Sequence, residues 1–392
     1  MKFYLWHRFA YRIIVAVLTP LTRIVLGYHR VKHRGPDVPS IIIANHNGEF
    51  DAALVAVGFR KHMYFVSSEH VLRQKSRLAV FSIKYIANPI PINKTFADIV
   101  SIKEILKRVK AGASVCIFAE GDRASYGTTE PIPLSTAKLI KSSKAQLITY
   151  RIVGGYLSTP LWGKNKRKGR ITAEPVGIYS AAELKAKTNE QVLEIIERDI
   201  YENATERQNQ EHILYKGEDL AEHIELVLYI CPECKRVGTI KSSGDRFWCS
   251  CGLDAVYTES GEFFGDKLKF KTIDEWARWQ IKELADIIEK TADVHGTDGG
   301  TDPICSDEEQ SLYIIDSAKK IDFAGKGAMY IDHNVFHCAG SSFKLSDITR
   351  FSVSGSMTLM FSTKDGTSYE VHSPHPRSAL KYKEIFGMLN KG

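Results

Sequence analysis

The stretch "ANHNGEFD", residues 44–51, lies between two apolar runs, "SIII" before it and "AALVAVGF" after it. The β-branched run predicts a strand, Asn47-Gly48 predicts a turn, and a helical pattern begins at Asp51. On one continuous helix, His46 and Asp51 would lie about 140° apart and would not touch. The turn between strand and helix therefore brings an imidazole and a carboxylate together at the end of a strand.

The charge of the chain is divided unequally between its two halves. Residues 1–180 hold 28 Lys+Arg against 10 Asp+Glu, a balance of +18, and residues 181–392 hold 25 against 36, a balance of −11, which together give the net +7. A length of 392 residues predicts two or three domains. The basic half suits a phosphate-bearing partner such as anionic lipid or a nucleotide.

A second polar cluster follows another predicted strand, in "ASVCIFAEGDRAS", residues 113–125. Ligands of open α/β sheets bind at the carboxyl ends of strands, which is where Glu120, Gly121 and Arg123 would lie. Gly121 permits close backbone approach, and Arg123 offers a planar fork for a phosphate. Glu120 is expected to orient Arg123 or a substrate hydroxyl. The alternative is a Glu–Arg pair that only caps the loop.

Residues 29 to about 185 resemble the lysophosphatidic acid and glycerol-3-phosphate acyltransferase family. The first family motif, Asn-His-x4-Asp, is matched in full by Asn45, His46 and Asp51. The third motif, Phe-Pro-Glu-Gly-Thr-Arg-Ser, is matched in kind by Phe118, Glu120, Gly121, Arg123 and, one position later, Ser125. The second motif has Lys94 in the place of its Arg, and the fourth has Thr149-Tyr150 where a Pro is usual.

The resemblance implies an acyltransferase that moves a fatty acyl group from an acyl thioester, acyl-CoA or acyl-carrier protein, to the free hydroxyl of lysophosphatidate. His46 would be the general base, oriented by Asp51, and the phosphoglycerol would be held by Lys94, Glu120, Gly121 and Arg123. The product would be phosphatidate. Two alternatives stay open: another acceptor, such as glycerol-3-phosphate or a lyso-aminolipid, and an inactive lipid- or protein-binding adaptor. Asp122 beside Arg123 is the reason to keep other acceptors in view.

Two further segments predict membrane contact. Residues 1–28 are expected to form amphipathic helices on the membrane surface, with arginines reaching the headgroups and an apolar side made of Trp6, Phe9, Ile13 and Val17. The longest uncharged piece, 13–22, is shorter than the ~20 residues that span a bilayer. The alternative is a helix packed on its own domain. The basic loop "GKNKRKGR", 163–170, would meet anionic lipid or coenzyme A phosphates, or is simply solvated.

Four of the seven cysteines, Cys231, Cys234, Cys249 and Cys251, form two pairs separated by a spacer of hairpin length. This spacing predicts a zinc ribbon over 213–256 with a structural zinc held by four thiolates. Unligated thiols and an iron–sulfur cluster are the alternatives. An odd number of cysteines with one cluster indicates a reducing compartment. We therefore expect a cytoplasmic protein, peripheral on the inner face of the membrane. No nucleic-acid partner is expected, because the ribbon lies in the acidic half.

The rest of the chain predicts a helix and a linker over 257–310 and short strands from 311 to the end. A closing helical stripe gives a small antiparallel domain over 311–392 that resembles a pleckstrin-homology-like module in element order alone. The predicted fold class is thus α/β: an acyltransferase domain over 29–212 with a mixed sheet flanked by helices, then a zinc ribbon and a small β-rich α+β domain.

Overall fold

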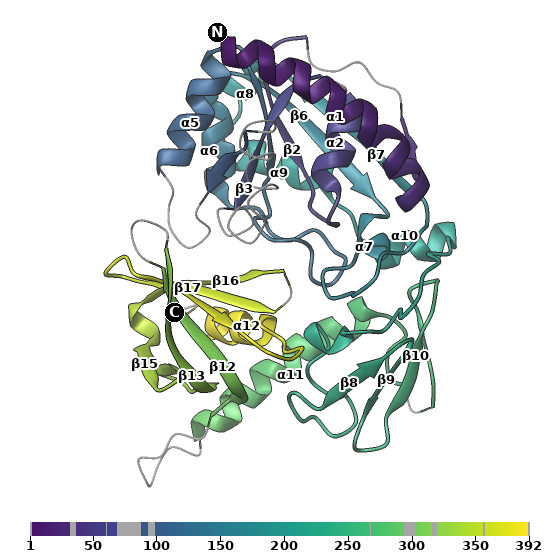
Figure 1. Cartoon of the computed structure of the whole chain (residues 1–392), viewed down its shortest axis with the longest axis vertical. Coiled ribbons are helices and arrows are strands. Elements are labelled where there is room, and N and C mark those ends of the chain that lie inside the picture. The colour runs from purple at the N-terminus through teal and green to yellow at the C-terminus, as the bar shows by residue number, and fades with distance from the viewer. Residues whose placement is uncertain are drawn as a thin grey trace. The chain divides into compact units, whose positions relative to one another are not determined.

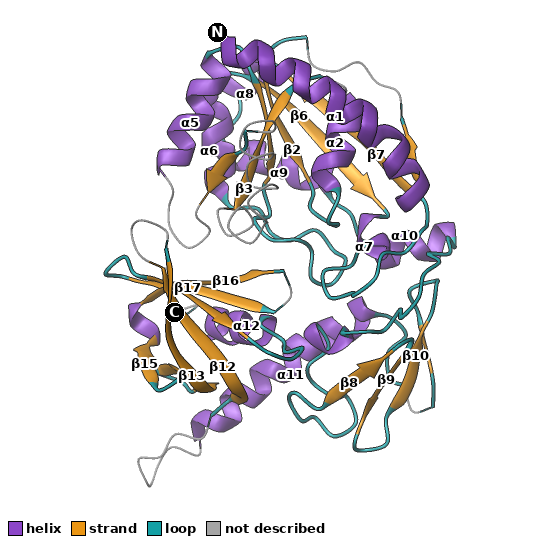
Figure 2. Cartoon of the chain, viewed as in Figure 1, coloured by secondary structure: helices purple, strands orange, loops and turns teal. Residues whose placement is uncertain are grey.

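The computed structural model describes residues 2–31, 37–59, 61–68, 88–92, 99–266, 268–293, 303–315, 320–355 and 357–390. The chain forms two compact units (Figure 1). The first comprises 1–161 and 165–217, and the second comprises 162–164 and 218–392. The predicted class is confirmed: a mixed α/β unit is followed by a β-rich region of antiparallel sheets (Figure 2).

The first unit is built on a seven-stranded sheet of order β1-β7-β6-β2-β5-β3-β4. Its strands are β1 (Tyr28–Arg30), β2 (Ser40–Ala44), β3 (Met63–Ser68), β4 (Ile90–Ile92), β5 (Ser114–Phe118), β6 (Gln146–Val153) and β7 (Ile171–Tyr179). Strands β6, β2, β5, β3 and β4 run parallel, whereas β7 is antiparallel to β6 and parallel to β1. Strand β2 lies in the middle and is buried along its whole length, which explains its continuous apolar run.

Helices cover both faces of this sheet. Alternate residues of β2 point to opposite faces, so Ile42 packs with helices α1 (Lys2–Leu26) and α2 (Asp51–Phe59). Ile41 and Ile43 pack with the helices of the other face, which are α5 (Ile99–Lys110), α6 (Leu134–Ser143), α8 (Ala181–Lys185) and α9 (Asn189–Ile200). Two short helices complete the unit, α7 (Gly155–Ser158) and α10 (Ala204–Glu211).

One helix, α1, fills most of the segment for which we predicted several helices, and Pro20 lies inside it. Proline removes a backbone donor, and the Thr19 hydroxyl donates to the carbonyl of Val15 at 2.6 Å in the turn just before it. Tyr11 and Val15 are buried in the core, whereas the apolar side chains on the opposite side are exposed, including Trp6, Phe9, Ile13 and Val17. The part Trp6–Leu26 is also long and apolar enough to cross a bilayer.

The second unit begins with a four-stranded antiparallel sheet of order β11-β10-β9-β8. Its strands are β8 (Ile240–Ser243), β9 (Arg246–Cys249), β10 (Asp254–Tyr257) and β11 (Phe263–Phe264), preceded by a 3-10 turn, Ile224–Leu226. The paired cysteines lie at or beside turns of this region, and a zinc ribbon here stays a prediction. The segment Trp162–Lys164 belongs to this unit, and Trp162 is buried with its ring against the edge of Tyr257.

A long helix, α11 (Ile273–Asp293), leads to a second seven-stranded sheet of order β15-β14-β13-β12-β18-β17-β16. Its elements are β12 (Cys305–Ile315), β13 (Ile321–Ile331), β14 (Val335–Cys338), β15 (Ser341–Lys344), a 3-10 turn (Leu345–Asp347), β16 (Ile348–Ser354), β17 (Thr358–Thr363), β18 (Ser368–His372) and α12 (Leu380–Leu389). Strand β12 therefore starts inside the predicted linker. Residues of the cysteine region and of α11, such as Tyr229 and Leu284, share one core with this sheet. Its likeness to a pleckstrin-homology-like module stays a prediction.

Candidate active site and candidate metal centre

His46 and Asp51 meet at the carboxyl end of β2, as the sequence predicted. His46 Nδ1 lies 2.8 Å from Asp51 Oδ2. Because a carboxylate only accepts hydrogen bonds, the proton of this bond lies on Nδ1. Nε2 makes no hydrogen bond with any described residue, and a quarter of the His46 side chain is exposed whereas Asp51 is fully buried. In the neutral imidazole, Nε2 is then the nitrogen that can accept a proton, and the buried carboxylate holds the ring in that tautomer.

The turn residues between them fix the carboxylate. Asp51 Oδ2 also accepts the backbone N–H groups of Asn47 at 2.7 Å and Gly48 at 2.9 Å. A Cβ atom on Gly48 would lie 2.7 Å from Thr159 Oγ1 and 3.0 Å from the carbonyl oxygen of Gly155. Only glycine fits there, so the Asn-Gly turn serves close packing against the start of the β6–β7 connection as well as chain reversal.

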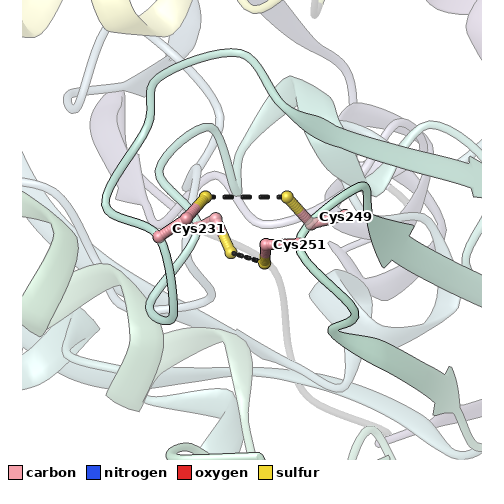
Figure 3. Close-up of side chains that lie close together, drawn as sticks. Cys231, Cys249 and Cys251 are labelled. Atoms are coloured by element: carbon pink, nitrogen blue, oxygen red, sulfur yellow. Dashed lines mark hydrogen bonds between the residues drawn. The ribbon is translucent and has the colours of Figure 1, made fainter.

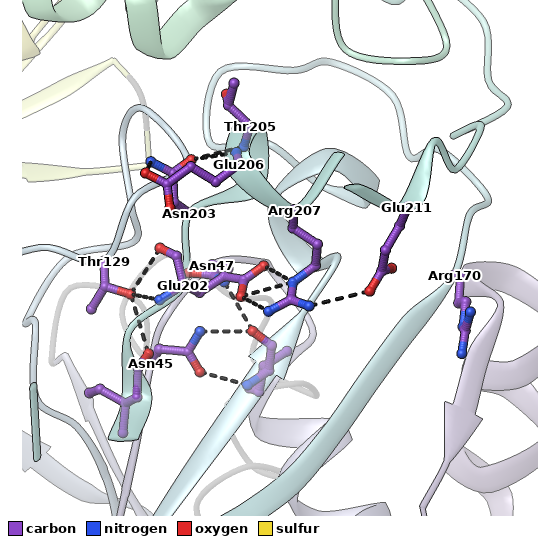
Figure 4. A network of polar contacts seen from close by, with 12 residues as sticks. Asn45, Asn47, Thr129, Arg170, Glu202, Asn203, Thr205, Glu206, Arg207 and Glu211 are labelled. Atoms are coloured by element: carbon purple, nitrogen blue, oxygen red, sulfur yellow. Dashed lines mark hydrogen bonds and ion pairs between the residues drawn. The ribbon is translucent and has the colours of Figure 1, made fainter. Parts of the chain in front are cut away.

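Two asparagines tie the loop to the neighbouring strand (Figure 4). Asn45 Nδ2 donates to the carbonyl of Ile152 at 2.8 Å, and Asn45 Oδ1 accepts the N–H of Ile152 at 2.7 Å. Asn47 Nδ2 donates to the same carbonyl at 3.2 Å. These amides satisfy the backbone of β6 where β2 ends, and so fix the position from which His46 projects. The first motif's Asn is therefore a positioning residue in this chain.

Glu120 lies at the end of β5 with both oxygens bonded to backbone. Oε1 accepts the N–H of His46 at 2.6 Å, and Oε2 accepts the N–H of Glu130 at 2.7 Å. Burial raises the pKa of Glu120 to about 8, although the two backbone N–H groups oppose the rise. The structure thus places Glu120 against the loop that carries His46, where it joins the ends of β5 and β2.

Of the other predicted substrate-binding residues, the structure describes Gly121 and Arg123. Arg123 lies in the loop after β5: burial lowers its pKa, and the negative charges of Asp51 and Glu49 oppose that shift. No described residue forms a hydrogen bond or ion pair with its guanidinium. Gly121 has φ +81° and open space beside its Cα. Lys94 lies outside the described residues.

Phe118 packs on the imidazole of His46. Its ring stacks on His46 with centroids 4.5 Å apart and planes 25° from parallel. This contact restrains the ring from the side of β5, while Asp51 restrains it at Nδ1. Phe118 belongs to the third motif, but its contact with His46 could not be read from a sequence separation of 72 residues.

The residues that sequence reasoning missed come from the connection between β6 and β7. Thr159 Oγ1 accepts the N–H of Glu49 at 3.0 Å, and Gly155 lies beside Asp51 Oδ1. That oxygen is buried, and no described residue donates to it. Both residues lie over 100 positions from the loop that they support, so no local pattern identifies them.

Four cysteine sulfurs converge in the second unit, a candidate metal centre that Figure 3 shows from close by. Cys231 and Cys234 lie in a tight turn, Cys249 ends β9, and Cys251 lies in the following turn. All four sulfurs lie within 4.8 Å of one another, with Cys231 to Cys251 at 3.6 Å and Cys234 to Cys249 at 3.8 Å. This cluster can bind a metal ion.

These separations fit the geometry of a thiolate-bound metal. In a tetrahedral site with Zn–S bonds of about 2.3 Å, the sulfurs lie about 3.8 Å apart. Arg236 Nε donates to Cys234 Sγ at 3.5 Å and would help to balance the charge of the thiolates. The remaining cysteines, Cys116, Cys305 and Cys338, are buried free thiols away from the cluster.

Comparison with known proteins finds one family match, and it lies within the first unit. Residues 25–153 match the family described as Acyltransferase, and this range contains both strand-end clusters. Among solved structures, the chain is similar to the 1-acyl-sn-glycerophosphate (LPA) acyltransferase PlsC from Thermotoga maritima, with 16% identity, a TM-score of 0.41, and coverage of 49% of this chain and 78% of that chain. No curated protein shows significant similarity to the chain.

Proposed function

We propose that this protein transfers a fatty acyl group from an acyl thioester, acyl-CoA or acyl-carrier protein, to the free hydroxyl of lysophosphatidate, which yields phosphatidate. The observation that carries the proposal is the 2.8 Å contact between His46 Nδ1 and Asp51 Oδ2, inside a segment that matches the Acyltransferase family. A unit that only bound lipid would have no use for a base oriented in this way.

The chemistry follows from the two nitrogens of His46. Nε2 takes the proton of the substrate hydroxyl while that oxygen attacks the thioester carbonyl. Asp51 accepts from Nδ1–H and stabilises the imidazolium that forms, with the substrate hydroxyl in the place of a serine. Collapse of the tetrahedral intermediate breaks the C–S bond, and the proton on Nε2 passes to the leaving thiolate. Arg123 and Lys94 are proposed to hold the acceptor phosphate beside Gly121.

The test is acyl transfer from radiolabelled acyl-CoA to lysophosphatidate in vesicles, with purified wild-type protein and the variant His46→Ala. The matched control is His29→Ala, since His29 is an exposed histidine of the same unit. We expect phosphatidate from the wild type and the control, and none from His46→Ala. Equal activity of all three proteins would refute the role of His46. If the wild type acylates no acceptor with either donor, the enzyme proposal fails.

We further propose that this protein is cytoplasmic and peripheral, and that α1 binds the inner face of the membrane. One side of α1 is buried against the core of the unit, while the other exposes apolar side chains among arginines. A helix packed along its own unit suits binding in the plane of the interface. Extraction at alkaline pH would release such a protein, whereas a bilayer-spanning helix would stay in the pellet.

For the cysteine cluster we propose a structural zinc ion held by Cys231, Cys234, Cys249 and Cys251. Four protein ligands leave no open position, so the metal would fold the ribbon and take no part in catalysis. Metal analysis is expected to find about one zinc per wild-type chain. The variant Cys249→Ser should lose the ion, whereas Cys116→Ala, which changes a cysteine outside the cluster, should keep it. Full zinc content in Cys249→Ser would exclude this ligand set.

A further inference from the structure

The connection between β6 and β7 lies at the edge of the sheet where the catalytic clusters lie. Strand β6 is parallel to β2, and β7 returns antiparallel to β6, so residues 154–170 join them at the carboxyl end of β2. His46 and Arg123 follow the same ends of β2 and β5. Residues 154–170 all lie after the segment that matches the Acyltransferase family, which ends at residue 153.

This connection is held against the catalytic loop. Thr159 accepts the N–H of Glu49 at 3.0 Å, and the N–H of Arg167 donates to the carbonyl of Ser158 at 2.8 Å. Arg167 is only 2% exposed, and Lys168 forms a pair of backbone hydrogen bonds with Lys216. The residues next to Lys166 are therefore fixed in place.

Lys166 reaches back to the loop that carries the catalytic pair. Its Nζ lies 4.4 Å from the centroid of the Phe50 ring, and Phe50 directly precedes Asp51. An aromatic face attracts an ammonium group but does not neutralise it. Within the part of the chain that the structure describes, Lys166 forms no ion pair. The connection contains no acidic residue, and its cations are Lys164, Lys166, Arg167, Lys168 and Arg170.

We propose that Lys166 binds a phosphate group of the acyl-transfer substrates, as a second cation beside Arg123. The inference rests on the proposed function. Both cations lie at one edge of the sheet. Among the described residues Lys166 forms no ion pair, and Arg123, although attracted by the charges of Asp51 and Glu49, forms none either, so both can bind a phosphate dianion. The phosphate belongs either to the lysophospholipid acceptor or to the coenzyme A part of the donor.

The experiment compares wild type, Lys166→Gln and the control Lys138→Gln, which changes an exposed lysine of α6 outside the connection. KM is measured for lysophosphatidate and for phosphate-free monoacylglycerol, and for acyl-CoA and a phosphate-free acyl N-acetylcysteamine thioester. Loss of a charge-assisted contact should raise one KM about 10- to 100-fold in Lys166→Gln. A rise for lysophosphatidate alone assigns the acceptor phosphate, and a rise for acyl-CoA alone assigns the donor.

Calorimetric binding of glycerol 3-phosphate and of coenzyme A separates this inference from the proposed function. Lys166→Gln should bind one of the two about 10- to 100-fold more weakly than the wild type and Lys138→Gln, even if the wild type acylates nothing. Equal constants in the three proteins, in kinetics and in binding, would overturn the inference. So would a wild type that binds neither probe.

Discussion

Glu120 Oε1 accepts the backbone N–H of His46 at 2.6 Å, so a side chain at the end of one strand holds the backbone of the proposed base at the end of the next. Its second oxygen accepts the N–H of Glu130 in the following loop. A residue expected to contact substrate is thus engaged on both oxygens by backbone. Its contribution to catalysis would act through the position of His46.

Glu120 is expected to make stability depend on pH. Burial raises the pKa of Glu120 to about 8 in the folded state, above the value of about 4.3 of an unfolded glutamate. Between these values the folded state binds more protons, so the contribution of this group to stability falls as the pH rises. The Tm of the wild type, measured relative to that of Glu120→Gln, should therefore fall as the pH rises from about 5 to about 8.5. The control Glu197→Gln changes an exposed glutamate, and its curve of Tm against pH should run parallel to that of the wild type. A parallel curve for Glu120→Gln would contradict the prediction.

Asp51→Asn is expected to lower kcat by about 10²- to 10⁴-fold with a smaller change in KM. Asp51 Oδ2 accepts from His46, Asn47 and Gly48, and an amide oxygen could take its place, but a neutral amide lacks the negative charge that stabilises the imidazolium. Kinetics with saturating acyl donor give the measurement. Asp37→Asn changes an exposed carboxylate that pairs with Lys61 and should keep full kcat. A kcat for Asp51→Asn within about threefold of wild type would remove Asp51 from the mechanism.

Gly48→Ala should reduce both stability and activity. The new Cβ would lie 2.7 Å from Thr159 Oγ1, so either the loop or the β6–β7 connection must move, at a cost of about 1–3 kcal/mol. Thermal unfolding and initial rates are the measurements. Gly387→Ala is the matched substitution, because it lies in α12 with no described atom within 4 Å of its Cβ. Gly387→Ala should be neutral or stabilising by up to about 1 kcal/mol. If Gly48→Ala is tolerated equally well, the packing around the loop is loose.

Arg207→Met is expected to lower the free energy of unfolding by about 3–5 kcal/mol, since it leaves the buried Glu202 carboxylate unpaired. The two side chains form a forked pair with contacts of 2.8 Å, and burial raises the pKa of Glu202 while Arg207 opposes the rise (Figure 4). Urea unfolding followed by circular dichroism tests this. Lys61→Met breaks the exposed pair with Asp37 and should cost less than about 1 kcal/mol. Similar losses in the two variants would show that burial of Glu202 carries no penalty.

Replacement of exposed apolar residues of α1 should release the protein from membranes. Phe9 is 58% exposed and Val17 is 61% exposed, so the double variant Phe9→Gln, Val17→Gln removes apolar area that the core does not use. Co-sedimentation with vesicles that contain anionic lipid should fall, while Tm stays unchanged. Ile178→Gln, an equally exposed apolar site on β7, should still sediment. Sedimentation of all proteins alike would place the membrane contact elsewhere.

The sequence predicted those features that lie within one short segment. His46 and Asp51 are five residues apart, and their contact follows from one turn; the four cysteines similarly converge because two tight turns face each other. The support of the site could not be predicted in this way. Asn45 binds Ile152, Glu120 binds the backbone of His46, and Gly48 approaches Thr159, and each of these contacts depends on sheet order and on connections far along the chain.

The assignment of Trp162–Lys164 to the second unit has a consequence for how this protein can be divided or recombined. Trp162, 1% exposed, lies in the β6–β7 connection, between parts of the chain that belong to the first unit. A chain truncated after Gly217 would lack Tyr257 and the rest of the second unit. The indole of Trp162 would then be exposed to water. The C-terminal unit is therefore not joined to the rest of the chain at a single junction. A fusion that supplies or removes it must also redesign the three residues 162–164, which lie between parts of the first unit.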